Sequence, residues 1–319
     1  MLDMFADIAE DLGRVEEELQ AAMQSSDPFI METATLLIHA GGKRLRPAYC
    51  LLGAKFYQYD LDKILPLAVA LEIFHMATLV HDDVVDSAVT RRGSPTVKSI
   101  WGNRISTHLG NYLLAKSLIL ISSYKNPMIP GVLADTSVKM CEGEILQIAT
   151  VQDPFQSLKD YFYRINRKTA LLLAASCQLG AVACGAPPSI YHPLRRYGHF
   201  IGMAFQITDD ILDLVADQQE LGKPVGSDLR QGIVTLPIIL ALEQSPKKER
   251  IREIVAQKEK TDQEIEEVIA LVSENGLEQA KNVALRYIQK AKGQLSLLPN
   301  IPAKDVLALI ADFIYGRHF

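Results

Sequence analysis

The segment LPLAVALEIFHMATLVHDDVVDSA, residues 65–88, decides the fold class of this 319-residue chain. Its apolar residues recur at three- and four-residue spacing, which is typical of a buried helix and not of a strand. Pro66 lies near the expected first turn, and Gly93 and Pro95 follow as stop signals. The same spacing continues through most of the chain, and convincing alternating segments are missing. The sequence therefore predicts an all-α protein.

The rest of the chain gives no sign of a domain boundary. A second helix is expected from about Leu194 through Asp213, and the C-terminal third reads as amphipathic helices with solvated charged faces. Glycine (19) and proline (15) are too scattered to mark a linker. Because 48% of the residues are hydrophobic, the chain can bury a large core. We predict one domain over residues 1–319.

Composition excludes several classes of function. A net charge of −5 argues against a nucleic-acid binder, which normally carries a basic stripe. The acidic N-terminus lacks the order of a signal peptide, and the uncharged stretch 169–191 is interrupted by Gln178 and a proline pair, so it is read as a buried helix. The cysteines form no CxxC pair and are expected to be reduced, buried thiols of a cytoplasmic protein. They are Cys50, Cys141, Cys177 and Cys184.

An acidic motif closes the first helix. In LVHDDVVDSAVTRR, residues 79–92, Asp82 and Asp86 lie four positions apart, so both carboxylates leave the same helix face, and Asp83 stands beside them. Like charges at that spacing repel unless a cation lies between them. Carboxylate oxygens suit Mg²⁺, which also binds substrate phosphate oxygens. A solvated acidic turn at a helix end would explain this motif equally well.

The same Asp-Asp-x-x-Asp pattern recurs in FQITDDILDL, residues 205–214, as Asp209, Asp210 and Asp213. Apolar residues surround this copy, which is unusual for a solvated face. Two facing acidic turns could hold several Mg²⁺ ions and, through them, a diphosphate. The repetition favours a metal site over two surface turns.

Cations stand near both motifs. GGKRLRP, residues 41–47, places Lys43, Arg44 and Arg46 after a glycine pair at an expected helix start, which suits an anion cradle. Arg91 and Arg92 follow the first motif, although they could simply complement the helix dipole. Other candidate substrate contacts are His75, which could equally be a core residue, and Lys168, Thr169 and Gln206. Metals for one diphosphate and cations for another suit a two-substrate reaction.

These motifs, together with NRKTA and GKPVGSDLRQG-VTLP, occur in the order that is typical of the trans-isoprenyl diphosphate synthases. The chain resembles this family from end to end. Among them it is similar to bacterial medium- and long-chain enzymes, especially the catalytic component of heptaprenyl diphosphate synthases. The resemblance implies a single-domain helical bundle around a central cavity, the type I isoprenoid synthase fold, usually dimeric.

The resemblance also implies roles for individual residues. Asp82 and Asp86 would hold Mg²⁺ on the allylic diphosphate, Asp209 and Asp213 would complete the metal cluster, and Asp83 and Asp210 would support them. The residues implied to bind isopentenyl diphosphate are Lys43, Arg46, His75 and Arg92. Those implied to contact the allylic substrate are Arg91, Lys168, Thr169, Gln206 and Lys223. Lys168 and Lys223, together with the six aspartates of the two motifs, are expected to be catalytic.

The implied activity is Mg²⁺-dependent condensation of an allylic diphosphate with several isopentenyl diphosphates. Farnesyl diphosphate is the expected allylic primer. The expected product is an all-trans polyprenyl diphosphate of heptaprenyl length for quinone side chains such as that of menaquinone. Metals and fixed cations would stabilise the departing diphosphate, and a dry apolar pocket would protect the allylic cation. Two positions depart from the family pattern: Ile233 stands where a lysine is common, and the tail keeps Arg317 but ends in Phe319.

Product length is expected to depend on side chains beneath the first motif, because one helical turn of about 5.4 Å is close to the reach of one isoprene unit. Short-chain relatives often carry an aromatic residue where this chain has Ala77 and Thr78, so the floor is open. Phe74, one turn deeper, either stops growth early, giving a geranylgeranyl or farnesylgeranyl product, or is a core residue turned away from the tunnel.

Two other functions compete with this interpretation. A terpene cyclase would normally mix Asn, Ser and Glu in its second motif and would need no second diphosphate cradle. A non-catalytic subunit would be expected to lose the acidic motifs, and both are intact here. The sequence leaves open whether the chain forms a homodimer or pairs with a small, unlike subunit. Transient membrane contact during release of a lipid product fits the expected cytoplasmic location.

Overall fold

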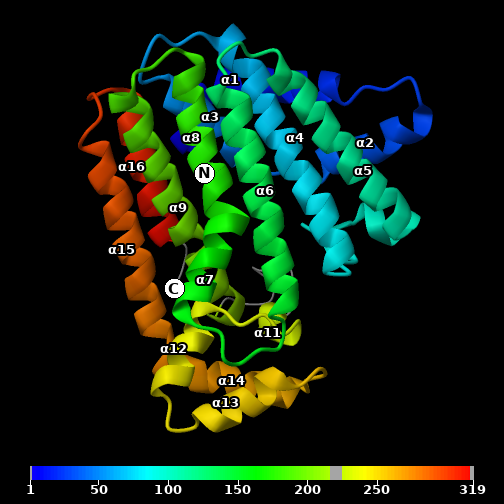
Figure 1. Cartoon of the computed structure of the whole chain (residues 1–319), viewed down its shortest axis with the longest axis vertical. Helices are drawn as coiled ribbons and strands as arrows, with labels where there is room; N and C mark the ends of the chain where they lie inside the picture. The colour runs from blue at the N-terminus through cyan, green and yellow to red at the C-terminus, as the bar shows by residue number, and fades with distance from the viewer. Residues whose placement is uncertain (1, 216–224, 317–319) are drawn as a thin grey trace. The chain divides into compact units, whose positions relative to one another are not determined.

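The computed structural model describes residues 2–215 and 225–316, and helices account for nearly all of the ordered elements (Figure 1). In chain order the elements are η1 (Leu2–Ile8), α1 (Ala9–Ala22), α2 (Pro28–His39), α3 (Leu45–Ala54), α4 (Leu61–Val85), β1 (Thr90–Arg91), β2 (Ser94–Pro95), α5 (Val97–Ser122), α6 (Met128–Ala149), α7 (Leu158–Ile165), η2 (Asn166–Ala170), α8 (Leu171–Ala183), α9 (Pro188–Val215), α11 (Ser227–Arg230), α12 (Leu236–Gln244), α13 (Lys248–Ala256), α14 (Asp262–Asn275), α15 (Leu277–Leu295) and α16 (Pro302–Tyr315). The prediction of an all-α protein is confirmed. The two-residue antiparallel hairpin β1–β2 was not predicted from the sequence.

The chain folds into two compact units that interleave along the sequence. The first unit comprises the described residues within Met1–Ala134, Ala175–Arg195 and Leu298–Leu307. The second comprises those within Asp135–Ala174, Arg196–Leu297 and Ala308–Phe319. The expectation of a single domain over residues 1–319 stays a prediction.

Helix α4 is the centre of the first unit and packs against α1, α3 and α5. The hydroxyl of Ser117 on α5 donates to the carbonyl of Ala70 on α4 at 2.9 Å, so buried polar groups join the two helices. By length and composition α4 is apolar enough to cross a membrane, but 72% of its most apolar window is buried inside the protein. Helix α4 therefore has the character of a core helix.

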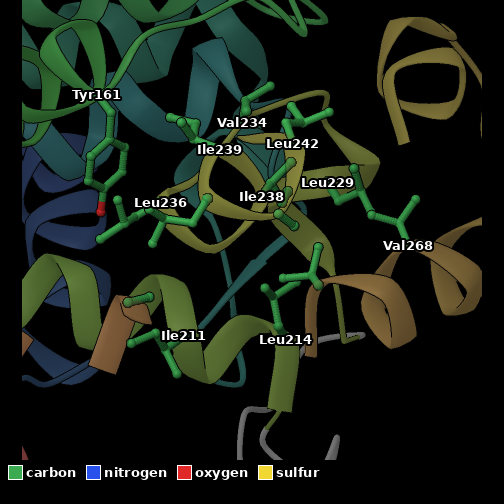
Figure 2. Packing of buried hydrophobic residues seen from close by; sticks show 14 of the residues in the cluster. Tyr161, Ile211, Leu214, Leu229, Val234, Leu236, Ile238, Ile239, Leu242 and Val268 are labelled. Atoms are coloured by element: carbon green, nitrogen blue, oxygen red, sulfur yellow. The ribbon is translucent and has the colours of Figure 1, made fainter. Parts of the chain in front are cut away.

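The second unit is organised around α12, which packs against α7, α13, α14 and α15. Figure 2 shows the buried side chains of this region, with Leu236 and Ile239 of α12 near Tyr161 of α7. Ile211 and Leu214 of α9 belong to the same apolar cluster. The helix that carries the second acidic motif is therefore anchored in a packed core.

Several boundaries differ from the predicted ones. Helix α4 begins at Leu61 and α9 begins at Pro188, so Pro66 and Pro193 lie inside helices and not near their starts. Both prolines are sixth in their helix, where the carbonyl left without a helical N–H donor belongs to an exposed residue in the first turn. The prediction of four buried thiols is wrong for Cys141, which is exposed on α6, and right for the other three cysteines.

Candidate functional site

The first acidic motif lies at the end of α4. Asp82 and Asp86 are half-buried, and the backbone N–H of Asp86 donates to the carbonyl of Asp82 at 2.8 Å in the last turn. Asp83 is buried and accepts a hydrogen bond from Nε of Arg91 at 2.7 Å. Burial raises the pKa of Asp83, and the charge of Arg91 opposes that rise. Asp82 and Asp86 are thus a pair of carboxylates one turn apart, whereas Asp83 between them is bonded to Arg91.

The β1–β2 hairpin carries two of the predicted cations. Its two loop residues, Arg92 and Gly93, both have positive φ (53° and 79°), as a type I′ turn requires. This turn directs Arg92 toward the 41–47 segment, where its Nη1 donates to the carbonyl of Gly41. Arg91 and Arg92 therefore diverge, one toward the acidic motif and one toward the glycine pair.

The glycine pair allows guanidinium groups to approach the backbone closely. A Cβ at Gly42 would lie 2.6 Å from Nη1 of Arg92 and 3.3 Å from Nη1 of Arg44. Arg44 itself has a left-handed backbone (φ 47°) at the N-cap of α3. The predicted helix entrance is confirmed, and a side chain at position 42 would make the guanidinium group of Arg92 move.

Arg44 is held by two carboxylates. Its Nε and Nη2 donate to the two oxygens of Glu16 on α1 at 2.8 and 3.0 Å, and its Nη1 donates to Glu72 on α4 at 3.1 Å. A forked pair of this kind fixes the guanidinium plane. Arg44 thus connects α1, α3 and α4, and neither of its acidic partners was predicted from the sequence.

The other cations of the cradle differ in exposure. Lys43 is exposed, whereas Arg46 is half-buried and its Nε atom is fully buried without a hydrogen-bond partner. Burial lowers the pKa of Arg46 to about 10, which leaves it charged at neutral pH. Burial, together with the positive charges of Arg46 and Arg92, lowers the pKa of His75 well below 6.5. His75 is therefore a neutral imidazole in a cationic surrounding.

The second acidic motif lies near the end of α9, and its middle carboxylate is again engaged. Asp210 is 3% exposed and accepts hydrogen bonds from the hydroxyl of Tyr161 at 2.7 Å and from Nε2 of Gln206 at 2.8 Å. Burial raises the pKa of Asp210 to about 6, and these two hydrogen bonds oppose the rise. Asp209 is half-buried.

The last aspartate of this motif is tied to the chain that follows. Asp213 is 1% exposed, and its Oδ2 accepts from the backbone N–H of Asp228 at 3.0 Å. Its carbonyl accepts from the N–H of Gly226 at 2.7 Å. Asp213 therefore fixes the start of α11 next to α9.

The π-helical turn η2 contains two predicted substrate contacts. A π-turn widens a helix locally and often marks a functional site. Here Lys168 lies 3.3 Å from a carboxylate oxygen of Glu144 and donates to Gln147 at 3.3 Å, both on α6. The hydroxyl of Thr169 donates to Gln206 at 2.6 Å. A hydrogen-bond chain thus runs from Thr169 through Gln206 to Asp210.

The remaining predicted residues lie on α4 or outside the described part of the chain. Phe74 and Ala77 are buried, at 3% and 2% exposure. Thr78 is half-buried, and its hydroxyl donates a hydrogen bond to the carbonyl of His75 at 2.8 Å. Lys223 lies outside the described residues. A role of the α4 residues in product length stays a prediction.

Within each unit the structure gathers part of the predicted site. The first unit holds the 41–46 cations, His75, Arg92 and the first motif, and the second holds Lys168, Thr169, Gln206 and the second motif. Sequence reasoning missed the residues that hold these groups: Glu16, Glu72, Glu144, Gln147 and Tyr161. One signal was available, because Glu72 is the only acidic residue in the apolar stretch between Asp62 and Asp82 and lies three residues before His75.

The donor atoms fit Mg²⁺ better than a metal held by protein alone. Among the residues that the structure describes, no three His, Cys, Asp or Glu side chains gather into a group that could hold a metal ion. Mg²⁺ takes one or two carboxylates, keeps several waters and accepts phosphate oxygens. One or two carboxylates of a single motif, with water and substrate phosphate completing the coordination, would match that preference.

Comparison with known proteins agrees with this chemistry. The sequence profile of polyprenyl synthetases matches residues 27–272. Heptaprenyl diphosphate synthase component 2 of Geobacillus stearothermophilus is 46% identical over 99% of this chain and 98% of its own length. The Bacillus subtilis protein of the same name is 44% identical over 97% of this chain and 89% of its own length.

Solved structures give the same result. The crystal structure of heptaprenyl diphosphate synthase from Staphylococcus aureus matches with a TM-score of 0.93, at 35% identity, over 98% of this chain and 99% of that one. A polyprenyl synthase from Caulobacter crescentus, complexed with calcium and isoprenyl diphosphate, matches with a TM-score of 0.94 at 35% identity, over 100% of this chain and 98% of that one.

The helical fold and the paired acidic motifs define the class of this protein, an all-helical prenyltransferase. The chain belongs to the polyprenyl synthetase family.

Proposed function

We propose that this protein is a Mg²⁺-dependent trans-prenyltransferase that extends an allylic diphosphate with isopentenyl diphosphate units to heptaprenyl diphosphate. One observation carries the proposal: the chain combines two Asp-Asp-x-x-Asp helix ends with two separate sets of cations. Relatives that are 44–46% identical over nearly the whole chain are named as heptaprenyl diphosphate synthase components. Farnesyl diphosphate is the primer that we propose.

The allylic diphosphate is assigned to the acidic motifs. Asp82 and Asp86 would hold Mg²⁺ from the first motif, and Asp209 with Asp213 from the second. Bound Mg²⁺ would neutralise the charge that develops on the departing diphosphate. Asp83 and Asp210, both engaged with neighbouring side chains, would support the ligands beside them.

Cations near the acidic motifs would contact the same substrate. We assign Arg91, Lys168, Thr169, Gln206 and Lys223 to the allylic diphosphate. Arg91 bonds to Asp83 and Lys168 lies beside Glu144, so each would exchange or share a carboxylate when a diphosphate binds. Such fixed cations stabilise a leaving group whose negative charge grows as the C–O bond breaks.

Isopentenyl diphosphate is assigned to the cradle of the first unit. Lys43, Arg46 and Arg92 would bind its phosphates through charge-assisted hydrogen bonds. His75, whose pKa is lowered well below 6.5, would donate one hydrogen bond from its neutral ring. The alkene of this substrate attacks the allylic carbon, a proton leaves the adduct, and the longer allylic diphosphate enters the next cycle.

Assembly and location follow from the same relatives. Because two of them are named component 2, we propose that this chain works with a small, unlike subunit. The exposed apolar residues on the described part of α6, Val138, Ile145 and Ile148, offer a surface for a partner chain. We further propose a cytoplasmic enzyme that contacts membranes transiently when it releases its lipid product.

The test is an assay of the purified chain with farnesyl diphosphate, isopentenyl diphosphate and Mg²⁺, followed by chromatography of the dephosphorylated products. A heptaprenyl product, formed by the chain alone or after a second polypeptide is added, supports the function. Product from the chain alone argues against an obligatory partner. No polyprenyl product under either condition contradicts the proposal.

Matched variants make the assay specific. Asp82→Asn and Asp209→Asn remove one proposed metal ligand each and should reduce turnover by about a hundredfold or more, as loss of a main electrostatic group does. Asp62→Asn changes an exposed carboxylate in the first turn of the same helix α4 and serves as the control. Full activity of both site variants would remove the acidic motifs from the reaction.

A further inference from the structure

Glu72 is a buried acid without an assigned role. It is 4% exposed and is the only acidic residue in α4 between Asp62 and the first motif. One carboxylate oxygen accepts from Arg44 at 3.1 Å, and the other, Oε2, is fully buried without a hydrogen-bond partner. Burying a carboxylate costs several kcal/mol unless charge and hydrogen bonding compensate. Its surroundings must therefore supply positive charge.

Three guanidinium groups supply that charge. The negative charge of Glu72 acts on Arg44, Arg46 and Arg92, and for each of them it raises the pKa. The guanidinium groups also repel one another: the charge of Arg92 lowers the pKa of Arg46, and the charges of Arg91 and Arg44 lower the pKa of Arg92. Glu72 is the carboxylate common to all three.

Arg44 has a structural role, called here a strut because it connects the 41–47 segment to α1 and α4, and it is not assigned to substrate. Three of its N–H groups are taken by Glu16 and Glu72. The strut ties the cradle to α1 on one side and to α4 on the other. A shift of Arg44 would move the backbone on which Lys43 and Arg46 stand.

We propose that Glu72 is a positioning residue for the isopentenyl diphosphate site, whose buried carboxylate fixes Arg44 and holds the guanidinium groups of Arg46 and Arg92 together before substrate binds. This inference rests on the proposed function of the cradle. A cluster of like charges that is already assembled binds a diphosphate without the cost of ordering each side chain. The repulsion that opposes assembly is offset by a carboxylate that the substrate cannot reach.

Glu72→Gln tests the inference, because it keeps the shape of the side chain and an acceptor for Arg44 but removes the charge. Binding of isopentenyl diphosphate to the full chain is measured by calorimetry without Mg²⁺, and binding of farnesyl diphosphate with Mg²⁺. We expect the Kd for isopentenyl diphosphate to rise about tenfold, which corresponds to about 1.4 kcal/mol, and the Kd for farnesyl diphosphate to change less than about twofold. Glu72→Asp should restore much of the affinity, since it restores the charge.

One further variant separates the possible failures. Lys43→Gln removes a proposed ligand, so an unchanged Kd for isopentenyl diphosphate in that variant would overturn the site assignment itself. If Lys43→Gln weakens binding and Glu72→Gln does not, the positioning role is wrong. Tighter binding in Glu72→Gln would show that the carboxylate merely opposes the anion, and equal weakening for both substrates would show a general structural role. Either outcome overturns the inference.

A second route avoids dependence on one buried substitution. Glu16→Gln loosens the same strut from α1, where the carboxylate side chain is 36% exposed, so it tests the inference even if Glu72→Gln does not fold. We expect a selective rise of about threefold in the Kd for isopentenyl diphosphate. Glu17→Gln is the matched control, since Glu17 is more exposed on the same helix and pairs only with Arg14 at 3.4 Å among the contacts described. Equal behaviour of the two α1 variants would contradict the strut.

Discussion

Removal of one hydroxyl from the core of the second unit should destabilise the protein by an amount that depends on pH. Tyr161 is completely buried, and its hydroxyl donates to Asp210 at 2.7 Å. In Tyr161→Phe the ring and its edge-on contact with Phe162 remain, so no cavity forms. The change is therefore the loss of one hydrogen bond to a buried carboxylate. Such bonds contribute about 1.5–3 kcal/mol.

The effect should be largest at alkaline pH. Burial raises the folded-state pKa of Asp210 to about 6, whereas an unfolded aspartate titrates near about 4. The folded protein thus binds this proton more tightly, and its stability increases as the pH falls from about 6 to about 4. The Tyr161 hydroxyl lowers this pKa, so the variant's pKa is higher still. We expect a loss of about 2 kcal/mol at pH 8, where the carboxylate is ionised, and about 1 kcal/mol at pH 5.

Urea unfolding in EDTA at the two pH values measures the difference without interference from metal binding. Tyr163→Phe is the control, because Tyr163 lies on the same helix α7 but is 41% exposed. Its loss should stay within about 0.5 kcal/mol at both pH values. An equal loss for Tyr161→Phe at pH 5 and pH 8, or a loss as small as the control's, would refute the reasoning.

Three other predictions test the length of the product, the packing of α8 and the need for metal. Phe74→Ala should lengthen the product and Ala77→Phe should shorten it to about three or four units, because successive turns of α4 are spaced by about one isoprene unit; unchanged chromatograms for both would exclude these residues as the ruler. Gly180→Ala should cost about 3 kcal/mol in urea unfolding, since its Cβ would lie 1.9 Å from the carbonyl oxygen of Cys50, while Gly13→Ala, with nothing within 4 Å, should not destabilise. Chelation by EDTA should abolish product formation but spare isopentenyl diphosphate binding, and product formed in EDTA would contradict the assignment of the acidic motifs.

The fold class and the acidic motifs could be predicted because both follow from local sequence. Helical periodicity appears in any window of a buried helix, and the Asp-Asp-x-x-Asp spacing fixes which carboxylates share a face. Helix starts were predicted less well. The helices were expected to begin at about Leu65, with Pro66 as an entry signal, and at about Leu194, whereas they begin at Leu61 and Pro188 and each contains a proline one turn further in. Exposure of Cys141 depends on tertiary packing that apolar neighbours in the sequence do not specify.

The groups that hold the site could not be predicted because they come from distant parts of the chain. Tyr161 and Asp210 are 49 residues apart, and Arg44 lies 28 residues from both Glu16 and Glu72. No local spacing pairs such residues. The hairpin that directs Arg92 was missed for another reason, since positive φ at a non-glycine residue leaves little trace in composition.

The repeated Asp-Asp-x-x-Asp pattern is not a repeated set of three equivalent ligands. In both motifs the middle aspartate is buried and bonded to protein side chains, Asp83 to Arg91 and Asp210 to Tyr161 and Gln206. A carboxylate that already accepts these donors has fewer lone pairs to offer a cation. The pattern therefore combines two features in each motif, because the first aspartate is only half-buried, as the proposed metal ligand needs to be. The buried second aspartate fixes the helix end from which the first one projects.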